Sequence, residues 1–197
     1  MSRYVGTDSY VYPDTGVLRN RGNILDQEAL DAFEADAVAV RMLELEDNPI
    51  QGSFDLQHLC AVHRHLLQDV SDWAGEIRTV DISRGSSRFA NFGLIDSYLG
   101  NKLAGLAKES FLRGLAPDEF IARMAHYMGE INAAHPFREG NGRVQRSFCA
   151  QLARGAGYFI DFETVQQDEM YAAMIPSFSG NEKPLADLLT EITAIVE

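Results

Sequence analysis

Residues 135–146 carry the side chains of this chain that are best suited to chemistry. They read His-Pro-Phe-Arg-Glu-Gly-Asn-Gly-Arg-Val-Gln-Arg. An imidazole can take a proton from a hydroxyl group, and a glycine-rich backbone flanked by arginines can hold phosphate. The stretch therefore has the parts needed to bind a nucleotide triphosphate and to transfer part of it to a hydroxyl group.

Gly140, Asn141 and Gly142 stand between two stretches with helical patterns, 117–134 and 143–157. The N-terminus of a helix presents unpaired backbone N–H groups and a partial positive charge, which suit a phosphate. The glycines let the backbone curl and let phosphate oxygens approach closely. A lone Gly-x-Gly is more often a simple turn, so the prediction of an anion site needs a second signal.

Arg143 and Arg146 supply that signal. They are three positions apart on the expected helix and therefore share one of its faces. Each guanidinium can hold phosphate oxygens through two parallel hydrogen bonds. We therefore predict a phosphate site at this junction, formed by the Gly-Asn-Gly backbone and both arginines.

Three other residues of the stretch have predicted roles. His135 precedes Pro136, which disfavours helical geometry, so we expect its imidazole to act as a general base; the alternative is a histidine that interacts with the end of the preceding helix. Glu139 could hold Mg²⁺, which commonly takes one or two protein carboxylates; the alternative is a solvated loop acid. Phe137 is expected to turn inward and anchor the loop to the core.

Two further groups of side chains are weaker candidates. His58, His63 and His65 lie five and two positions apart, so they point in different directions around a helix and do not suit a zinc site. We expect them to form hydrogen bonds in the core or on the surface. Tyr171 could flank an adenine base or pack in the core.

Apolar residues recur at three- and four-residue spacing along much of the chain, which predicts a mainly α fold. Residues 78–83 alternate in polarity and predict a strand, which a turn at 85–87 joins to a return strand at 88–90. Asp26 and Ser53 are the expected N-caps of the first two helices, and helices are predicted at 26–46, 53–70, 94–112, 117–134, 143–157, 165–177 and 184–196. The predicted architecture is a single-domain helical bundle with one short β-hairpin.

The composition narrows the class of protein. The chain has 197 residues, 46% hydrophobic and 23% charged, as expected for one globular domain. A net charge of −12 argues against a nucleic-acid-binding face, which needs clustered Lys and Arg. No apolar stretch approaches the about 20 residues of a membrane span, and the first residues do not resemble a secretory signal. Cys60 and Cys149 are expected to be buried thiols, so we predict a cytoplasmic protein; a dedicated secretion system stays an open alternative.

Residues 135–146 match, at every specified position, the Fic family signature His-Pro-Phe-x-(Asp/Glu)-Gly-Asn-Gly-Arg-x-x-Arg. The resemblance covers roughly residues 54–185, and Trp73–Arg78 with the hairpin is similar to the family's flap region. It implies a Fic-fold helical bundle in which residues 1–52 form an N-terminal extension and first helix packed on a core. That core spans residues 53–197 and holds the flap hairpin at about 78–90, the motif loop and the C-terminal helices.

The resemblance implies transfer of AMP from ATP, with Mg²⁺, to a Ser, Thr or Tyr hydroxyl of a target protein. By this resemblance, His135 deprotonates the hydroxyl and Glu139 holds the magnesium. The Gly140–Gly142 backbone forms the anion hole, and Arg143 and Arg146 bind the terminal phosphates. A related subfamily of kinases has Lys at the position of Gly142, so the glycine favours AMP transfer. The residues expected to dock the target by strand addition are Ser83, Arg88, Phe89 and Ala90; the alternative is a plain surface hairpin.

The resemblance also implies how the enzyme is regulated. Residues around Tyr12-Pro13 and Gly16–Leu18 resemble bacterial Fic toxins of toxin–antitoxin pairs. The inhibitory pattern (Ser/Thr)-x-x-x-Glu-(Gly/Asn) has no complete match, since Thr193–Glu197 has the spacing without the final residue. A separate small antitoxin is therefore expected to supply a glutamate to Arg146. Type II topoisomerases are the implied kind of target for the toxin subclass.

Other functions stay open at this level. The chain could be a nucleotide-sensing module that only binds a partner protein, although a pure binder has no need of a base such as His135. The same scaffold could also use a different phosphate-linked donor, or remove AMP instead of adding it.

Overall fold

The structure is a computed structural model that describes residues 8–85 and 87–196. Predictions about residues 1–7, Ser86 and Glu197 lie outside the described residues, including the expected absence of a signal segment and the last position of the incomplete inhibitory pattern. None of the helices in the described ranges combines the length and the apolar character needed to cross a bilayer.

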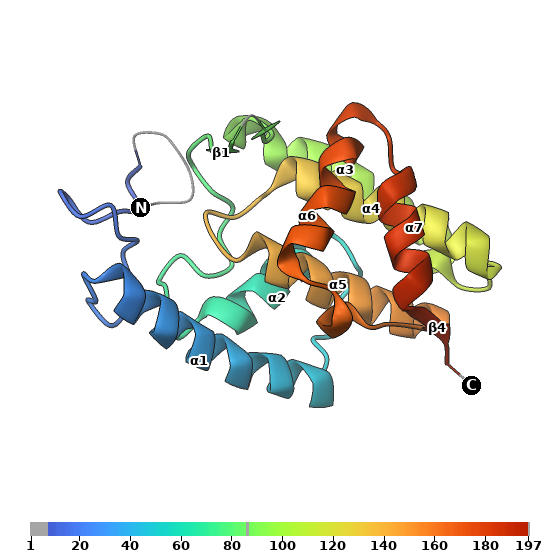
Figure 1. Ribbon diagram of the computed structural model, residues 1–197, viewed down its shortest axis with the longest axis horizontal. Helices are drawn as coiled ribbons and strands as arrows, with labels where there is room; N and C mark the ends of the chain where they lie inside the picture. Colours follow the sequence, from blue (N-terminus) through green and yellow to red (C-terminus); the bar gives the residue numbers. More distant parts are fainter. Residues whose placement is uncertain (1–7, 86, 197) are drawn as a thin grey trace.

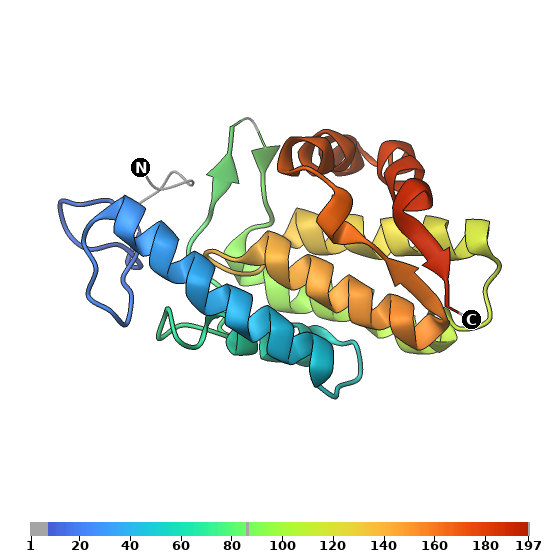
Figure 2. The ribbon, with the colours of Figure 1, turned by 60° about the horizontal axis from the view of Figure 1, so that its bottom comes forward.

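The helices α4 (Pro117–Ala134) and α5 (Asn141–Ala156) form the centre of the fold. α5 packs against α2 (Leu56–Leu67), which in turn contacts α1 (Gln27–Asp47). α4 packs against α3 (Ile95–Lys108) and α7 (Lys183–Ile192). In Figures 1 and 2, α1 covers one side of the central pair, and α6 (Gln167–Met174) and α7 cover the opposite side.

One apolar core joins these elements. It includes Leu30, Val38 and Leu45 of α1 together with residues of α2, α4 and α5. The first helix therefore packs on the bundle, whereas the division of the chain at residue 52 stays a prediction. The mainly α, single-bundle fold class is confirmed.

The ends of several helices follow from local chemistry. The Asp26 side chain accepts a hydrogen bond from Ala29 N at 2.9 Å, as expected of an N-cap. Pro117 occupies the first turn of α4, where its missing N–H costs nothing. The bounds 117–134 are confirmed. The predicted cap Ser53 is wrong, because Asp55 caps α2 and accepts from His58 N at 2.8 Å.

The predicted helix 94–112 is too long. α3 ends at Lys108, and Ser110–Leu112 form a 3₁₀ turn in which all three residues have positive φ, between 54° and 62°. An α-helix of L-residues cannot continue through such angles. The apolar pattern persists through this turn because Leu112 still packs in the core, so periodicity alone hid the break.

The C-terminal predictions need two corrections. The helix expected at 165–177 is the shorter α6, followed by a 3₁₀ segment Ile175–Ser179. The helix expected at 184–196 ends at Ile192, after which β4 (Thr193–Ile195) pairs antiparallel with β3 (Tyr158–Ile160). The one predicted hairpin is present, but this second pair of strands was not predicted, because two strands of three residues are too short for an alternating pattern to identify.

The flap hairpin is shorter than predicted. Its strands are β1 (Ser83–Arg84) and β2 (Ser87–Arg88), not 78–83 and 88–90. The backbone N–H of Arg78 donates to Pro136 O at 2.9 Å, so this part of the chain is bonded to the motif loop and not to a partner strand. Figure 2 shows the hairpin standing beside α6 on the face of the bundle.

Candidate active site

A cavity of about 390 Å³ opens where the motif loop meets the hairpin and α6. It is lined by every residue that the sequence assigns to the base, the metal and the phosphates: His135, Glu139, Gly140, Asn141, Gly142, Arg143 and Arg146. The hairpin contributes Arg84, and α6 contributes Met170, Tyr171 and Met174. Tyr171 thus borders the cavity.

His135 is the residue that ends α4. It adopts the left-handed conformation, with φ 44°, which turns its side chain out of the helical path. The imidazole is buried, lies against the ring of Phe89 at 3.8 Å between centroids, and borders the cavity. Burial, together with the smaller effect of the charges of Arg78 and Arg84, lowers the pKa of His135 to about 3. The imidazole is therefore neutral near pH 7, the form that can accept a proton.

The Gly-Asn-Gly segment forms the start of α5, where the backbone N–H groups are not used by the helix. Gly140 has φ 81°, a conformation that glycine adopts without strain. The side chain of Asn141 bonds the loop twice: it accepts from Phe137 N at 2.9 Å and donates to Phe137 O at 2.7 Å. The asparagine side chain thus fixes the loop, a contribution that the sequence did not reveal.

Phe137 is 1% exposed and stacks on His63 of α2, with centroids 3.9 Å apart. His63 Nδ1 accepts from Gly75 N at 2.7 Å, so Nε2 carries the hydrogen and donates to Glu139 O at 3.1 Å. This histidine therefore supports the motif loop from the side of the core. In the sequence, the burial of His63 is indicated only by its position among the apolar residues of the predicted second helix.

The two motif arginines have different surroundings. Arg143 forms an ion pair with Glu34 of α1. Arg146 forms no ion pair with any described residue, and burial and the nearby charge of Arg143 lower its pKa. A partly buried cation without a protein carboxylate is a favourable site for a ligand anion. The contact from Glu34 was missed, because an acid on the surface of a distant helix carries no pattern that links it to the motif.

The chemistry of Glu139 fits a nucleotide-bound magnesium. Its carboxylate accepts from Gly140 N at 3.1 Å and borders the cavity. The described residues contain no group of three or more His, Cys, Asp or Glu side chains that could hold a metal. One carboxylate suffices for Mg²⁺ when phosphate oxygens and water supply the other ligands. The histidines of α2 do not form such a group either.

The four residues predicted to dock a target are placed differently from one another. Ser83 lies on β1, and the exposed Arg88 lies 3.5 Å from Asp81. Phe89 is 7% exposed and packs on His135, and Ala90 N donates to Ala133 O at 3.0 Å. The docking role of these four residues stays a prediction.

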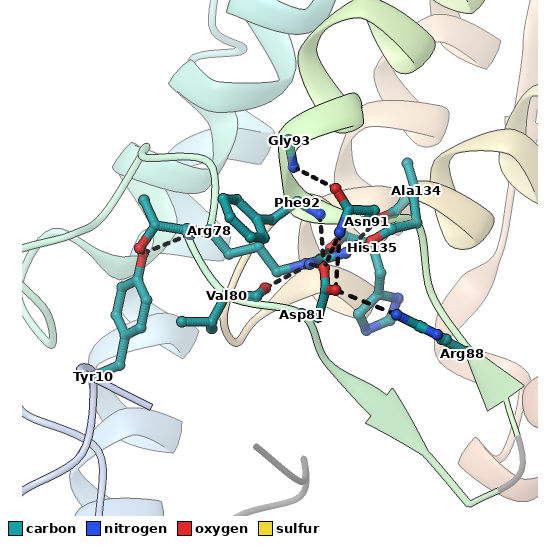
Figure 3. Close-up of polar contacts among 12 residues, drawn as sticks. Tyr10, Arg78, Val80, Asp81, Arg88, Asn91, Phe92, Gly93, Ala134 and His135 are labelled. Atoms are coloured by element: carbon teal, nitrogen blue, oxygen red, sulfur yellow. Dashed lines mark hydrogen bonds and ion pairs between the residues drawn. The ribbon is translucent and has the colours of Figure 1, made fainter. Parts of the chain in front are cut away.

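Arg78 joins the flap to the C-terminal end of α4 at His135. Its buried guanidinium donates to backbone carbonyls on both sides, including His135 O at 2.8 Å and Val80 O at 2.6 Å. Figure 3 shows this side chain between the hairpin and the end of α4. A second buried arginine, Arg138, forms an ion pair with Asp8 and so ties the N-terminal segment to the motif loop.

Replacing Gly140 by alanine is expected to reduce the free energy of unfolding by about 1–3 kcal/mol. A Cβ at this left-handed position would lie 3.2 Å from Leu67 Cδ2. Gly142→Ala is the matched control, since its Cβ would meet only the end of Arg146, at 3.4 Å, and alanine favours the helix. Urea unfolding of both variants measures the difference, and equal midpoints would contradict the expected strain.

Stability is expected to fall as the pH decreases below about 6.5. Burial lowers the pKa of His63 to about 4 and that of His135 to about 3, so the unfolded chain takes up protons that the folded chain does not. Each imidazole then contributes a slope of about 1.4 kcal/mol per pH unit between its two pKa values. Chemical unfolding at pH 7, 6, 5 and 4.5 measures the slope. His63→Gln should remove the contribution of one imidazole to the slope of the unfolding free energy against pH. An unchanged slope would show that His63 does not cause the loss of stability.

Comparison with known proteins identifies the family of this chain. Residues 53–153 match the Fic/DOC family. The chain is 46% identical to the protein adenylyltransferase VbhT of Bartonella schoenbuchensis over 98% of its own length, but it spans only 41% of that protein. It is 39% identical to the probable protein adenylyltransferase Fic of Escherichia coli, with 96% of this chain and 94% of that protein covered.

Solved structures share the fold of this chain. The BepC protein of Bartonella tribocorum, solved with bound AMPPNP, superposes with a TM-score of 0.88 at 28% identity, covering 95% of this chain and 97% of that one. The N-terminal Fic domain of a Bartonella quintana protein, solved with bound ADP, has a TM-score of 0.88 at 29% identity and covers 95% of each chain. On the match of sequence and fold, the chain belongs to the Fic/DOC family.

Proposed function

We propose that this chain is a protein adenylyltransferase, which transfers AMP from ATP to a Ser, Thr or Tyr hydroxyl of a target protein. The observation that carries the proposal is that the neutral imidazole of His135 and the phosphate-binding start of α5 border one cavity. A base beside a phosphate site is what a hydroxyl needs in order to attack phosphorus. The names of the relatives, and the nucleotides bound in the solved neighbours, support it.

The step follows from these positions. The target hydroxyl oxygen attacks the α-phosphorus of ATP, and its proton passes to the His135 imidazole. The bond between the α-phosphorus and the bridging oxygen breaks, and pyrophosphate leaves. Arg143 and Arg146 hold the terminal phosphates so that the α-phosphorus faces the attacking oxygen. The negative charge of the bound phosphates raises the pKa of the imidazole and so helps it to keep the proton.

Glu139 is the residue that would hold Mg²⁺. Bound there, the ion would offset the charge of the phosphates. The protein groups supply the rest: the backbone at Gly140–Gly142 stabilises the charge that develops on the phosphoryl oxygens, and the rigid loop keeps its N–H groups oriented before the reaction begins. The kinases of this family differ at Gly142, so the glycine supports AMP transfer.

Labelled ATP tests the reaction type. The chain is incubated with bacterial lysate and ATP that carries the label on either the α- or the γ-phosphate. AMP transfer labels protein only from the α-position, and phosphate transfer labels it only from the γ-position. Label in neither case, with ATP binding intact, would favour the rival function of a nucleotide-sensing binding module. Release of AMP from protein labelled beforehand would favour the reverse reaction.

A small antitoxin protein is the proposed regulator. A second cavity of about 470 Å³ lies on the other side of Arg146. It combines apolar residues of α1 with Arg154 of α5 and exposed Phe159 of β3, and Arg146 borders both cavities. A helix placed there could present a glutamate to Arg146 and exclude the terminal phosphate. Inhibition by a candidate partner should disappear when its glutamate is changed to glycine; inhibition that persists would contradict the proposal.

The proposed biological role is that of a bacterial cytoplasmic toxin, for which type II topoisomerases are the candidate targets. The two free cysteines fit a reducing compartment. Incubation of the purified topoisomerase subunits with the chain and ATP, followed by mass spectrometry, tests the target. An unmodified topoisomerase in a lysate where another protein gains AMP would contradict this choice while leaving the enzyme class intact.

A further inference from the structure

Arg84, on strand β1 of the hairpin, borders the cavity beside His135 and Tyr171. Its guanidinium carbon lies 3.9 Å from the centre of the Tyr171 ring on α6. The hairpin and α6 are far apart in the sequence, and Figure 2 shows them side by side. The Arg84 side chain therefore connects the flap to α6 at the border of the cavity.

The contact to Tyr171 orients the guanidinium without neutralising it. Arg84 forms no ion pair with any described residue, in contrast to Arg88 on the next strand, which faces Asp81. A cation on an aromatic face keeps its hydrogen-bond donors available at its edge. Among the arginines that border the cavity, Arg143 is paired with Glu34, whereas Arg84 and Arg146 have no described carboxylate. These two cations are placed for a ligand anion.

The two unpaired cations lie at different parts of the cavity. Arg146 is on α5, next to the phosphate loop, and borders the second cavity as well. Arg84 lies on the side of the base, since its hairpin leads into Phe89, whose ring stacks on His135 at 3.8 Å, and both Arg84 and His135 border the cavity. The phosphorus under attack must lie near the base, because the attacking oxygen gives its proton there. An anion at Arg84 is therefore the phosphoryl group that is transferred, not the one that leaves.

We propose that Arg84 is a further catalytic residue, which donates a hydrogen bond to a non-bridging oxygen of the transferred α-phosphate. This inference rests on the proposed AMP transfer. In the step itself, the hydroxyl oxygen bonds to the α-phosphorus, the bond to pyrophosphate breaks, and the proton goes to His135, while Arg84 stabilises the charge on the α-phosphoryl oxygens. When ATP binds, the N–H groups at the edge of the Arg84 guanidinium turn to the phosphate, whether or not its face stays on the Tyr171 ring. A charged hydrogen bond to phosphate is stronger than the aromatic contact.

Transfer rates with ATP and with each diastereomer of ATP carrying sulfur on the α-phosphorus test this contact. Sulfur accepts hydrogen bonds poorly, so the wild type should use one diastereomer more slowly than ATP. Arg84→Gln should reduce kcat with ATP by about 10²-fold, as found when a donor to a developing negative charge is removed. The sulfur penalty for that diastereomer should shrink by about tenfold in this variant. Arg84→Lys should keep part of the kcat with ATP and part of the sulfur penalty, because lysine retains the charge without the planar pair of donors.

Arg88→Gln is the matched comparison on the same hairpin, and it should keep the wild-type sulfur penalty whatever its effect on target binding. A raised KM for the target with an unchanged sulfur penalty in Arg84→Gln would mean that Arg84 contacts the target protein, and would overturn the proposal. Rates equal to the wild type would also overturn it. If the wild type transfers no AMP at all, the proposed function fails instead. Thermal unfolding of each variant confirms that it is folded.

Discussion

Replacing His135 by alanine is expected to slow AMP transfer by about 10²–10⁴-fold, the usual contribution of a positioned general base. The imidazole borders the cavity and is held by its neighbours in the neutral form, so it is ready to accept the hydroxyl proton. No other histidine borders this cavity among the described residues. Single-turnover rates with saturating ATP measure the chemical step directly.

Binding of ATP should change little in the same variant. Arg143, Arg146 and the backbone of the Gly-Asn-Gly segment, which are the groups proposed to hold the phosphates, are untouched in this variant. Isothermal titration with a non-hydrolysable ATP analogue should give a Kd within a few-fold of the wild type. Added imidazole should restore part of the rate, because the variant leaves a space beside Phe89 at the cavity wall. A variant that transfers AMP within tenfold of the wild-type rate would remove His135 from the role of base.

The motif loop could be predicted from the sequence because its chemistry is local. The base, the glycine segment and both arginines lie within one helix–loop–helix, so the spacing alone brings them to one junction. The helix bounds 117–134 could also be predicted, since a proline at the start and a left-handed residue at the end define that helix locally. Local signals of this kind do not depend on the rest of the chain.

The residues that hold the loop in place could not be predicted in the same way. Glu34 and His63 reach it from α1 and α2, and Arg84 reaches the cavity from the hairpin. Each contact depends on how separate helices pack, and a single charged or aromatic residue carries no periodic signal for that. The β3–β4 pair was missed for the same reason, because its register joins residue 158 to residue 195.

The His135 imidazole and the flap are in direct contact. Phe89 follows β2 and stacks on His135, and Ala90 N bonds to the last turn of α4. Asp81 accepts from Phe92 N at 2.8 Å and from the Asn91 side chain, and these bonds join the two chain segments that lead into and out of the hairpin (Figure 3). A displacement of the hairpin would therefore also move the Phe89 ring that packs on the His135 imidazole.

Replacing Arg78 by methionine is expected to lower the free energy of unfolding by about 3–5 kcal/mol, a large share of the stability of a domain of this size. The guanidinium is 1% exposed and donates to carbonyls of Val80, Ala90, Ala134 and His135. Methionine fills a similar volume but leaves these buried acceptors without their donor, which is costly away from water. Urea unfolding, with the midpoint and slope fitted together, measures the loss.

Arg88→Met is the matched control for Arg78→Met, because it removes the same group from the hairpin at a side chain that is 77% exposed. Its surface ion pair with Asp81 is worth at most about 1 kcal/mol. Arg78→Lys should fall between the two, since one ammonium group cannot reach carbonyls on both the hairpin and α4. Arg78→Met should also slow AMP transfer, because the flap and the carbonyl of His135 lose their common donor. Equal unfolding midpoints for Arg78→Met and Arg88→Met would show that the flap is held to the base by other contacts.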